Sequence, residues 1–130
     1  MHKLSEDLFQ NAVDLNDTIV FEYDIAGDAI RFSDNLTKYI PISQNISAFV
    51  ENLITRGKVH ADDVKSAIAF FSSAKNAGKV RMEYVRFLDF NGDYRWYQLK
   101  GRAQLDDNGK PVTLFGTLTY IDDEIGRAHV

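Results

Sequence analysis

The residue types that perform catalysis are scattered in this sequence. The three histidines, His2, His60 and His129, lie far apart, and no serine lies in a Gly-x-Ser-x-Gly turn of the kind that positions a nucleophile. Cysteine is absent, which excludes thiol nucleophiles, disulfides and cysteine-based zinc sites. The sequence therefore predicts a domain without catalytic residues of its own.

Two acidic clusters contain residues that could bind a metal or act as an acid and a base. Asp62 and Asp63 fall in the first turn of a predicted helix, where carboxylates favour the helix dipole and bind free N–H groups. The second cluster, Asp106-Asp107-Asn108-Gly109, lacks the ligand spacing and the closing glutamate of a calcium loop. We predict no metal site and interpret the second cluster as a turn.

The domain could instead bind a small molecule in a pocket, and the alternation of side chains along the strands indicates which residues would line it. Successive side chains of a strand point to opposite faces, so Tyr94, Trp96 and Gln98 share one face. Polar side chains among apolar ones on a helix-covered face would indicate a ligand site, because buried polar groups need partners. We expect Trp96 to face such a cavity, although it could instead lie on the outer face of the sheet. Each candidate residue could also make a structural contact in place of a ligand contact. The candidates are Tyr23, Tyr84, Arg86, Trp96, Gln98 and Thr117.

The hydrophobic pattern predicts the elements that must position these side chains. A period of 3.6 residues predicts helices over 3–15, 47–57 and 62–76. Runs rich in β-branched and aromatic residues predict strands over 18–24, 29–32, 79–89, 93–105 and 111–122. Asn91-Gly92 and Asn108-Gly109 are hairpin turn signals between the last three strands. The order predicts an α+β domain with helices gathered on a mainly antiparallel sheet.

The second half of the chain contains a series of ordered motifs: Val59-His60-Ala61-Asp62-Asp63, Arg86-Phe87, Asn91-Gly92-Asp93-Tyr94-Arg95-Trp96, Gly101-Arg102, Asp106-Asp107-Asn108-Gly109-Lys110-Pro111 and Leu114-Phe115-Gly116-Thr117. In this order the motifs resemble those of PAS sensory domains with a PAC-type C-terminal half. Departures from the family pattern are Ala61 in place of a proline, Tyr84 in place of a glutamate, and Tyr120-Ile121-Asp122 in place of Asp-Ile-Thr.

The resemblance implies a fold and a division of the chain. It implies a five-stranded antiparallel sheet in the order 2-1-5-4-3, with helices forming a pocket over one face. We expect an N-terminal amphipathic flanking helix in residues 1–17, the PAS domain in residues 18–122, and the start of a truncated signalling helix in residues 123–130.

Charge and hydropathy bear on the expected partners. The formal net charge is −4, and the Lys and Arg residues are spread along the chain, whereas nucleic-acid binding needs a clustered positive face. No apolar run approaches the roughly 18–20 residues of a membrane span. We therefore expect no nucleic-acid partner, no direct membrane contact and a cytoplasmic location, although the parent protein could be anchored elsewhere.

The resemblance also implies a function. It implies a non-catalytic sensory and dimerisation domain of a multidomain bacterial signalling protein, regulating a C-terminal output domain for cyclic-di-GMP synthesis or turnover, or a histidine kinase. We expect a homodimer through the N-terminal helix and the outer sheet face. The alternative is a ligand-free protein–protein interaction module with a filled core.

The cofactor of such a domain stays open at this point. Flavin photosensors of the family form an adduct with a cysteine, which this sequence lacks. Haem-binding relatives carry a histidine inside the long helix, where this sequence has Val64, Ala67, Ile68 and Phe71 at the inward positions. Non-covalent flavin binding and a small-molecule ligand of another kind remain options.

Overall fold

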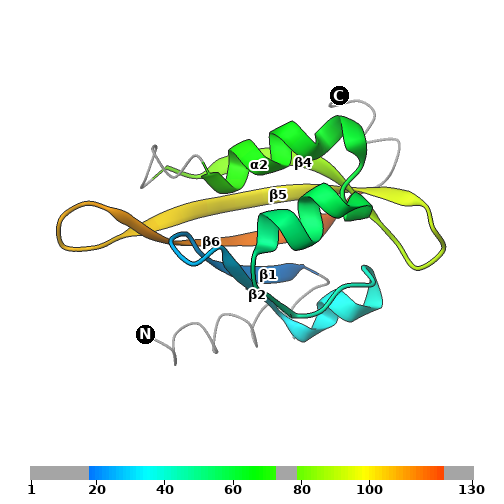
Figure 1. The fold of residues 1–130 in the computed structure, drawn as a ribbon, viewed down its shortest axis with the longest axis horizontal. Helices are drawn as coiled ribbons and strands as arrows, with labels where there is room; N and C mark the ends of the chain where they lie inside the picture. The colour runs from blue at the N-terminus through cyan, green and yellow to red at the C-terminus, as the bar shows by residue number, and fades with distance from the viewer. Residues whose placement is uncertain (1–17, 73–78, 122–130) are drawn as a thin grey trace.

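A computed structural model describes residues 18–72 and 79–121 of the chain (Figure 1). The helix predicted over 3–15, the end of the helix predicted over 62–76, and the segment from 122 onward lie outside these residues. The strands are β1 (Ile19–Asp24), β2 (Ala29–Phe32), β3 (Asn45–Ile46), β4 (Arg81–Leu88), β5 (Tyr94–Leu105) and β6 (Pro111–Tyr120). The helical segments are η1 (Asp34–Lys38), η2 (Val50–Lys58), η3 (Ala61–Asp63) and α2 (Val64–Ser72).

The strands form one antiparallel sheet in the order β3-β2-β1-β6-β5-β4. The predicted α+β class and the predicted order of five strands are confirmed. The sixth strand, β3, is an addition at the edge beside β2. It consists of two residues, Asn45 and Ile46, and so short a strand in an irregular stretch has no periodicity that a sequence pattern can detect.

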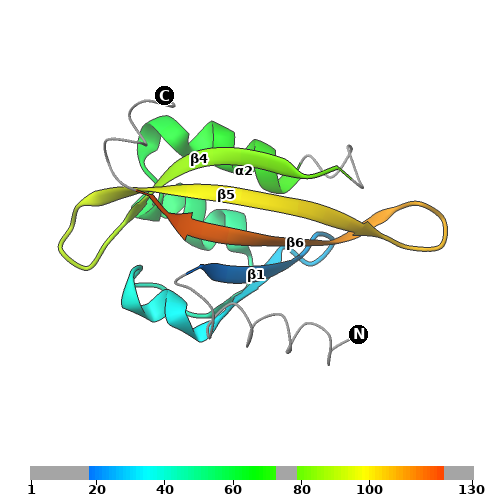
Figure 2. The same cartoon turned by 180° about the vertical axis from the view of Figure 1, so that it is seen from behind.

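The helical segments cover one face of the sheet, as the front and back views show together (Figures 1 and 2). The long helix begins as the turn η3, where the ring Nδ1 of His60 accepts a hydrogen bond from the backbone N–H of Asp62 at 3.1 Å. It continues as α2, which buries Ala67, Phe70 and Phe71 against the sheet. No helix of the described residues is long and apolar enough to cross a membrane.

Both long hairpin turns are held by the aspartate before the predicted Asn-Gly signal. One Oδ1 atom of Asp89 accepts hydrogen bonds from the backbone N–H groups of Asn91 and Asp93, at 2.8 and 2.9 Å. Asp106 makes the same two contacts, at the same distances, with Asn108 and Lys110. The aspartates therefore organise these turns together with the glycines that the sequence singled out.

The strand β6 occupies the middle of the sheet. Its residues 113–118 pair with β1 on one side, and the whole strand pairs with β5 on the other. At its end the backbone N–H of Ile121 donates a further hydrogen bond to the carbonyl of Trp96, at 3.0 Å. The last described residue thus still belongs to the sheet.

Candidate functional site

Aromatic rings of the described residues pack against one another between the helices and the sheet. The rings of Phe49 and Phe71 lie 4.7 Å apart, and Tyr23 lies 5.1 Å from Phe71 and 5.6 Å from Phe49. Phe21 joins the group 5.5 Å from Phe71. The resemblance placed a ligand pocket in this region. Among the described residues, however, these side chains form one contiguous core.

Two glycines of the sheet make room for these rings. Gly101 and Gly116 are partners in neighbouring strands and lie beneath the aromatic layer. A methyl group at Gly116 would come within 2.5 Å of the Phe21 ring, and one at Gly101 within 3.2 Å of the Phe70 ring. The glycines of this sheet are therefore part of the aromatic packing.

Tyr23 is the candidate residue that does face the helices. It is 5 % exposed, and its hydroxyl donates a 2.7 Å hydrogen bond to Oδ1 of Asp28. Burial and the neighbouring Asp28 raise the pKa of the phenol well above its usual value, so it remains a hydrogen-bond donor. Its position fits a structural contact between β1 and the turn that follows it.

The other candidates lie on the outer face of the sheet, so the expectation that Trp96 faces the helix-covered side is wrong. In β5 the alternate residues Tyr97 and Leu99 belong to the core, whereas Trp96 and Gln98 point away from it. Strand pairing places Tyr84 opposite Gln98 and Arg86 opposite Trp96. Alternation placed Trp96 and Gln98 on one face correctly, but the helices cover the opposite face, whose residues are more uniformly apolar.

A buried carboxylate holds Arg86 at the edge of this outer face. Asp63, 8 % exposed, accepts hydrogen bonds from Nε and Nη2 of Arg86 at 2.8 and 3.0 Å, and from its backbone N–H at 2.8 Å. This contact raises the pKa of the guanidinium further. The same guanidinium lies 4.4 Å from the centre of the Trp96 ring, within the range of a cation–π interaction. Asp63 therefore connects the start of α2 to the outer face through Arg86.

From the sequence, Asp63 was predicted only to lie in the first turn of its helix. No spacing rule connects it with Arg86, since the two residues are 23 positions apart and meet only because the chain before η3 runs along the edge of β4. The bridge between Val59 and Phe87 and the hydrogen bond from the N–H of His60 to the carbonyl of Arg86 fix that path.

The group of contacting side chains on the outer face extends from Arg86 along β4 and β5. The amide Nε2 of Gln98 lies 3.1 Å from the sulfur of Met82 and 3.5 Å from the hydroxyl of Tyr84. Met82 is 49 % exposed, so this end of the outer face presents a flexible apolar side chain. The structure thus brings Tyr84, Arg86, Trp96 and Gln98 together, as predicted, but on the surface opposite to the helices.

Thr117 lies on the same outer face but one strand further, on β6 between Lys100 and Val20. Next to it runs a row formed by Arg102 on β5, Phe115 on β6 and Glu22 on β1. Neither Arg102 nor Glu22 forms an ion pair within the described part of the chain. The row therefore places an aromatic ring between two charges of opposite sign.

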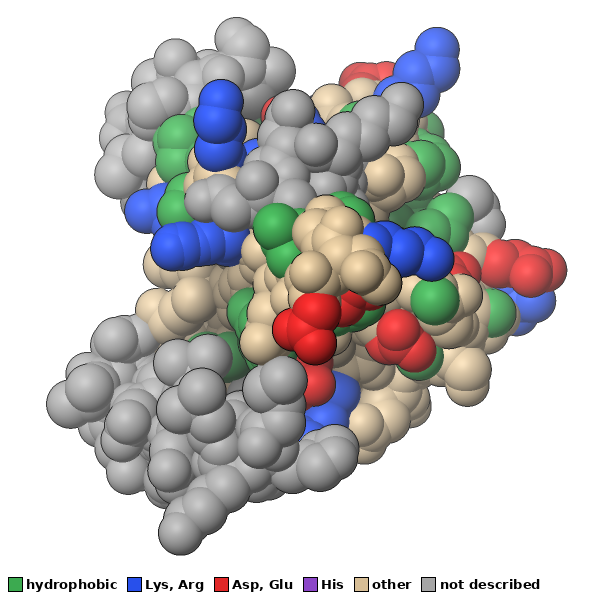
Figure 3. Space-filling view, turned by 90° about the vertical axis from the view of Figure 1, so that its left-hand side faces the viewer, with side chains coloured by type: hydrophobic (Ala, Val, Ile, Leu, Met, Phe, Trp, Pro, Cys, Tyr) green, Lys and Arg blue, Asp and Glu red, His purple; other side chains and the backbone are tan. Residues whose placement is uncertain are grey.

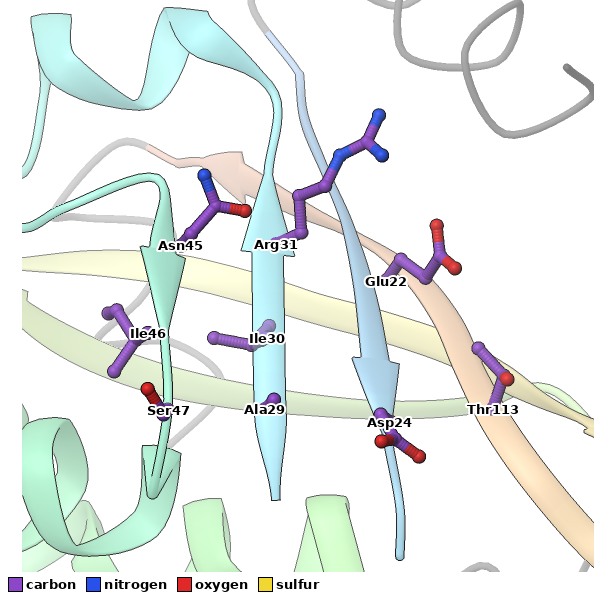
Figure 4. Close-up of a pocket in the computed structure, with 9 residues that line it drawn as sticks. All are labelled: Glu22, Asp24, Ala29, Ile30, Arg31, Asn45, Ile46, Ser47 and Thr113. Atoms are coloured by element: carbon purple, nitrogen blue, oxygen red, sulfur yellow. The ribbon is translucent and has the colours of Figure 1, made fainter. Parts of the chain in front are cut away.

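A hollow of about 440 Å³ opens on the side of this face formed by β1, β2 and β3 (Figure 4). Ala29 is the smallest side chain of its lining, and most of the other lining side chains are polar. No candidate residue from the sequence lines it. Its lining comprises Glu22, Asp24, Ala29, Ile30, Arg31, Asn45, Ile46, Ser47 and Thr113.

The end of the molecule that carries the β5–β6 hairpin has a different surface (Figure 3). Acidic, basic and hydrophobic side chains are interspersed there, which is usual for a solvated surface. The outer sheet face, with its aromatic residues and ordered charges, is therefore the better candidate for a functional surface.

Comparison with known proteins assigns the family. A model of the PAS fold matches residues 54–118, which is half of the chain. The chain belongs to the PAS fold family. The PAS fold is a non-catalytic fold, in agreement with the prediction that this chain has no catalytic residues. No curated protein matches the chain.

Solved structures of other PAS domains are similar over most of their length. A sensory box histidine kinase/response regulator from Burkholderia thailandensis superposes with a TM-score of 0.69 at 20 % identity, covering 93 % of this chain and 88 % of that one. The N-terminal domain of a diguanylate cyclase with PAS/PAC sensor from Marinobacter aquaeolei superposes with a TM-score of 0.67 at 19 % identity, covering 87 % of this chain and 99 % of that one. A light-oxygen-voltage domain superposes with a TM-score of 0.61 at 15 % identity, covering 95 % of this chain and 90 % of that one. At these identities the likeness establishes the fold.

Proposed function

We propose that this PAS domain is a sensory and dimerisation module of a multidomain signalling protein, and that it acts through the outer face of its sheet. The carrying observation is the row of Arg102, Phe115 and Glu22. Neighbouring strands are about 4.8 Å apart, so the backbones of Arg102 and Glu22 lie about 10 Å apart with that of Phe115 midway between them. Such a row is complementary to itself when a second copy is rotated by two-fold symmetry.

In that dimer, Arg102 of each copy would meet Glu22 of the other, and the two Phe115 rings would pack near the axis. The N-terminal segment, residues 1–17, would contribute to the same interface. The output domain would follow the C-terminus, and the similar structures suggest a histidine kinase or a diguanylate cyclase as its class. Rearrangement of the interface would then bias the pairing of the output domains.

The aromatic filling of the core favours the version of this function that needs no interior ligand. Five phenylalanines of the described residues, together with Tyr23, contact one another where a ligand would otherwise lie. We therefore expect native mass spectrometry of the purified domain to find no bound small molecule. A stoichiometric ligand would overturn the filled-core version and leave the dimer proposal standing.

Charge reversal tests the dimer. We expect light scattering after size exclusion to show a dimer for the wild type, and a dimer weakened at least about tenfold for Arg102→Glu or Glu22→Arg alone, because like charges then face each other. The double variant Glu22→Arg/Arg102→Glu restores opposite charges and should restore the dimer. Lys65→Glu, an exposed change on α2, is the control. A wild type that stays monomeric, or a double variant no better than the single ones, would contradict the interface.

A further inference from the structure

Two non-glycine residues of the described chain have a left-handed backbone, and both lie at one junction. Asp28, in the turn between β1 and β2, has φ 50°, and Ala48, before η2, has φ 48°. The carbonyl of Asp28 accepts a 2.8 Å hydrogen bond from the N–H of Phe49, the residue after Ala48. Aspartate tolerates this conformation, but alanine lacks a polar side chain to compensate for it. The strain at Ala48 is therefore maintained by contacts around it.

The side chain of Asp28 supplies those contacts. Its carboxylate accepts the hydrogen bond from Tyr23 and lies 3.3 and 3.4 Å from the N–H of Val50, the first residue of η2. One residue thus binds the start of η2 through its carbonyl and its carboxylate, while Tyr23 fixes that carboxylate from β1. Glycine precedes it at position 27, but Asp28 is the residue with positive φ.

The other end of η2 also leaves the helical conformation. Arg56 has φ −101° and ψ 20°, and Gly57 has φ 86°, a region that glycine enters without strain. The hydroxyl of Tyr94 fastens this end by donating a hydrogen bond to the carbonyl of Gly57 at 2.7 Å. The segment between Ala48 and Gly57 buries Phe49, Leu53 and Ile54 over the aromatic core.

We propose that residues 49–56 form a lid that opens as a unit about Ala48 and Gly57, with Asp28 as its latch. Closing the lid forms the hydrogen bonds of Asp28 and forces Ala48 into its left-handed conformation. Opening breaks those hydrogen bonds and relaxes Ala48. Hinges of this kind are a few residues at element ends that absorb the backbone change. The lid lies over the helix-covered face, so it stands independently of the dimer interface.

Hydrogen exchange on the full chain tests the latch. Asp28→Gly keeps the positive φ and removes the carboxylate, so we expect the amides of residues 50–55 to exchange about tenfold faster or more, while those of β5 and β6 keep their wild-type rates. Tyr23→Phe, which keeps the ring and removes the hydroxyl, should accelerate the same amides less. Acceleration of β5 and β6 in step with the segment, or no acceleration at all, would overturn the latch.

A substitution at the hinge should change the exchange rate of the same amides in the opposite direction. Ala48→Gly removes the strain of the closed state, so exchange of residues 50–55 should become slower than in the wild type. Residues 28 and 48 both lie beside the hydrogen bond from the N–H of Phe49 to the carbonyl of Asp28. If the two substitutions only weakened this junction in general, both variants would exchange these amides faster than the wild type. Faster exchange in the Ala48→Gly variant would overturn the role of Ala48 as a strained hinge.

Discussion

Asp63 binds both the backbone N–H and the guanidinium of Arg86, 23 residues further along the chain. The carboxylate comes from the start of the helical layer, and the guanidinium lies on the outer face of the sheet over Trp96. The contact therefore passes around the edge strand β4 and joins two surfaces that the sheet otherwise separates.

Replacing Asp63 by asparagine should lower the free energy of unfolding by about 1–3 kcal/mol, because a nearly buried partner of a charged group is lost. Urea unfolding of the two proteins measures this difference. Asp62→Asn is the matched control, since its carboxylate is 80 % exposed and 4.0 Å from Arg86, and exposed pairs contribute at most about 1 kcal/mol. Equal losses in the two variants would show that the buried contact has no special weight.

Replacing Arg86 by methionine should change the fluorescence of Trp96. This is the single tryptophan of the chain, so its emission reports this one ring. Loss of the guanidinium above it removes a cation–π partner and a cover from water, and we expect a red-shifted emission and stronger quenching by acrylamide. The exposed Lys65→Met variant should retain the wild-type spectrum. An unchanged spectrum in Arg86→Met would mean that the contact does not persist in solution.

The stability of the β4–β5 hairpin should depend on pH through Asp89. Hydrogen bonds from the N–H of Asp93, the guanidinium of Arg95 and the N–H of Asn91 lower the pKa of this carboxyl in the folded state. A group with a lowered folded pKa contributes stability above its unfolded pKa, about 3.9, and loses that contribution as the pH falls through the folded value. Urea midpoints measured from pH 6 down to pH 2 should therefore fall less steeply for Asp89→Asn than for the wild type. Parallel curves would contradict this, and Asp107→Asn serves as the control.

Replacing Gly116 by alanine should disrupt the core. The added methyl group would lie 2.2 Å from the carbonyl oxygen of Lys100 and 2.5 Å from the Phe21 ring, so the strand or the ring must move. We expect a loss of about 3 kcal/mol in the free energy of unfolding, the upper end of the usual cost of overpacking. At Gly101 the nearest atom lies at 3.0 Å, so alanine there should cost less. A smaller loss at Gly116 than at Gly101 would contradict the packing described above.

Local patterns in the sequence predicted most of the sheet. The change of period from 3.6 to 2 and the two Asn-Gly signals predicted β4, β5 and β6, and the family resemblance supplied the order of the strands. These features depend on neighbouring residues, so a single sequence contains them. The two residues of β3 have no such pattern. The assignments of residues 1–17, 18–122 and 123–130 remain predictions.

The candidate site shows what a sequence pattern cannot decide. Alternation placed Trp96 and Gln98 on one face correctly, because the period of a strand fixes which of its side chains lie together. It could not tell which of the two faces the helices cover, since apolar residues occur on both. The contact of Asp63 with Arg86 was missed for another reason: it depends on the path of the chain around β4, which no local spacing records.

The central position of β6 has a mechanical consequence. Any segment attached after Ile121 pulls on a strand that is hydrogen-bonded to β1 on one side and to β5 on the other. A force directed along β6 would load both ladders in shear at once, so many hydrogen bonds would resist it together. A force directed away from the sheet would instead load the bond between Ile121 and Trp96 first and peel the strand bond by bond. The direction of the pull therefore decides whether the whole sheet or only its Trp96 end yields.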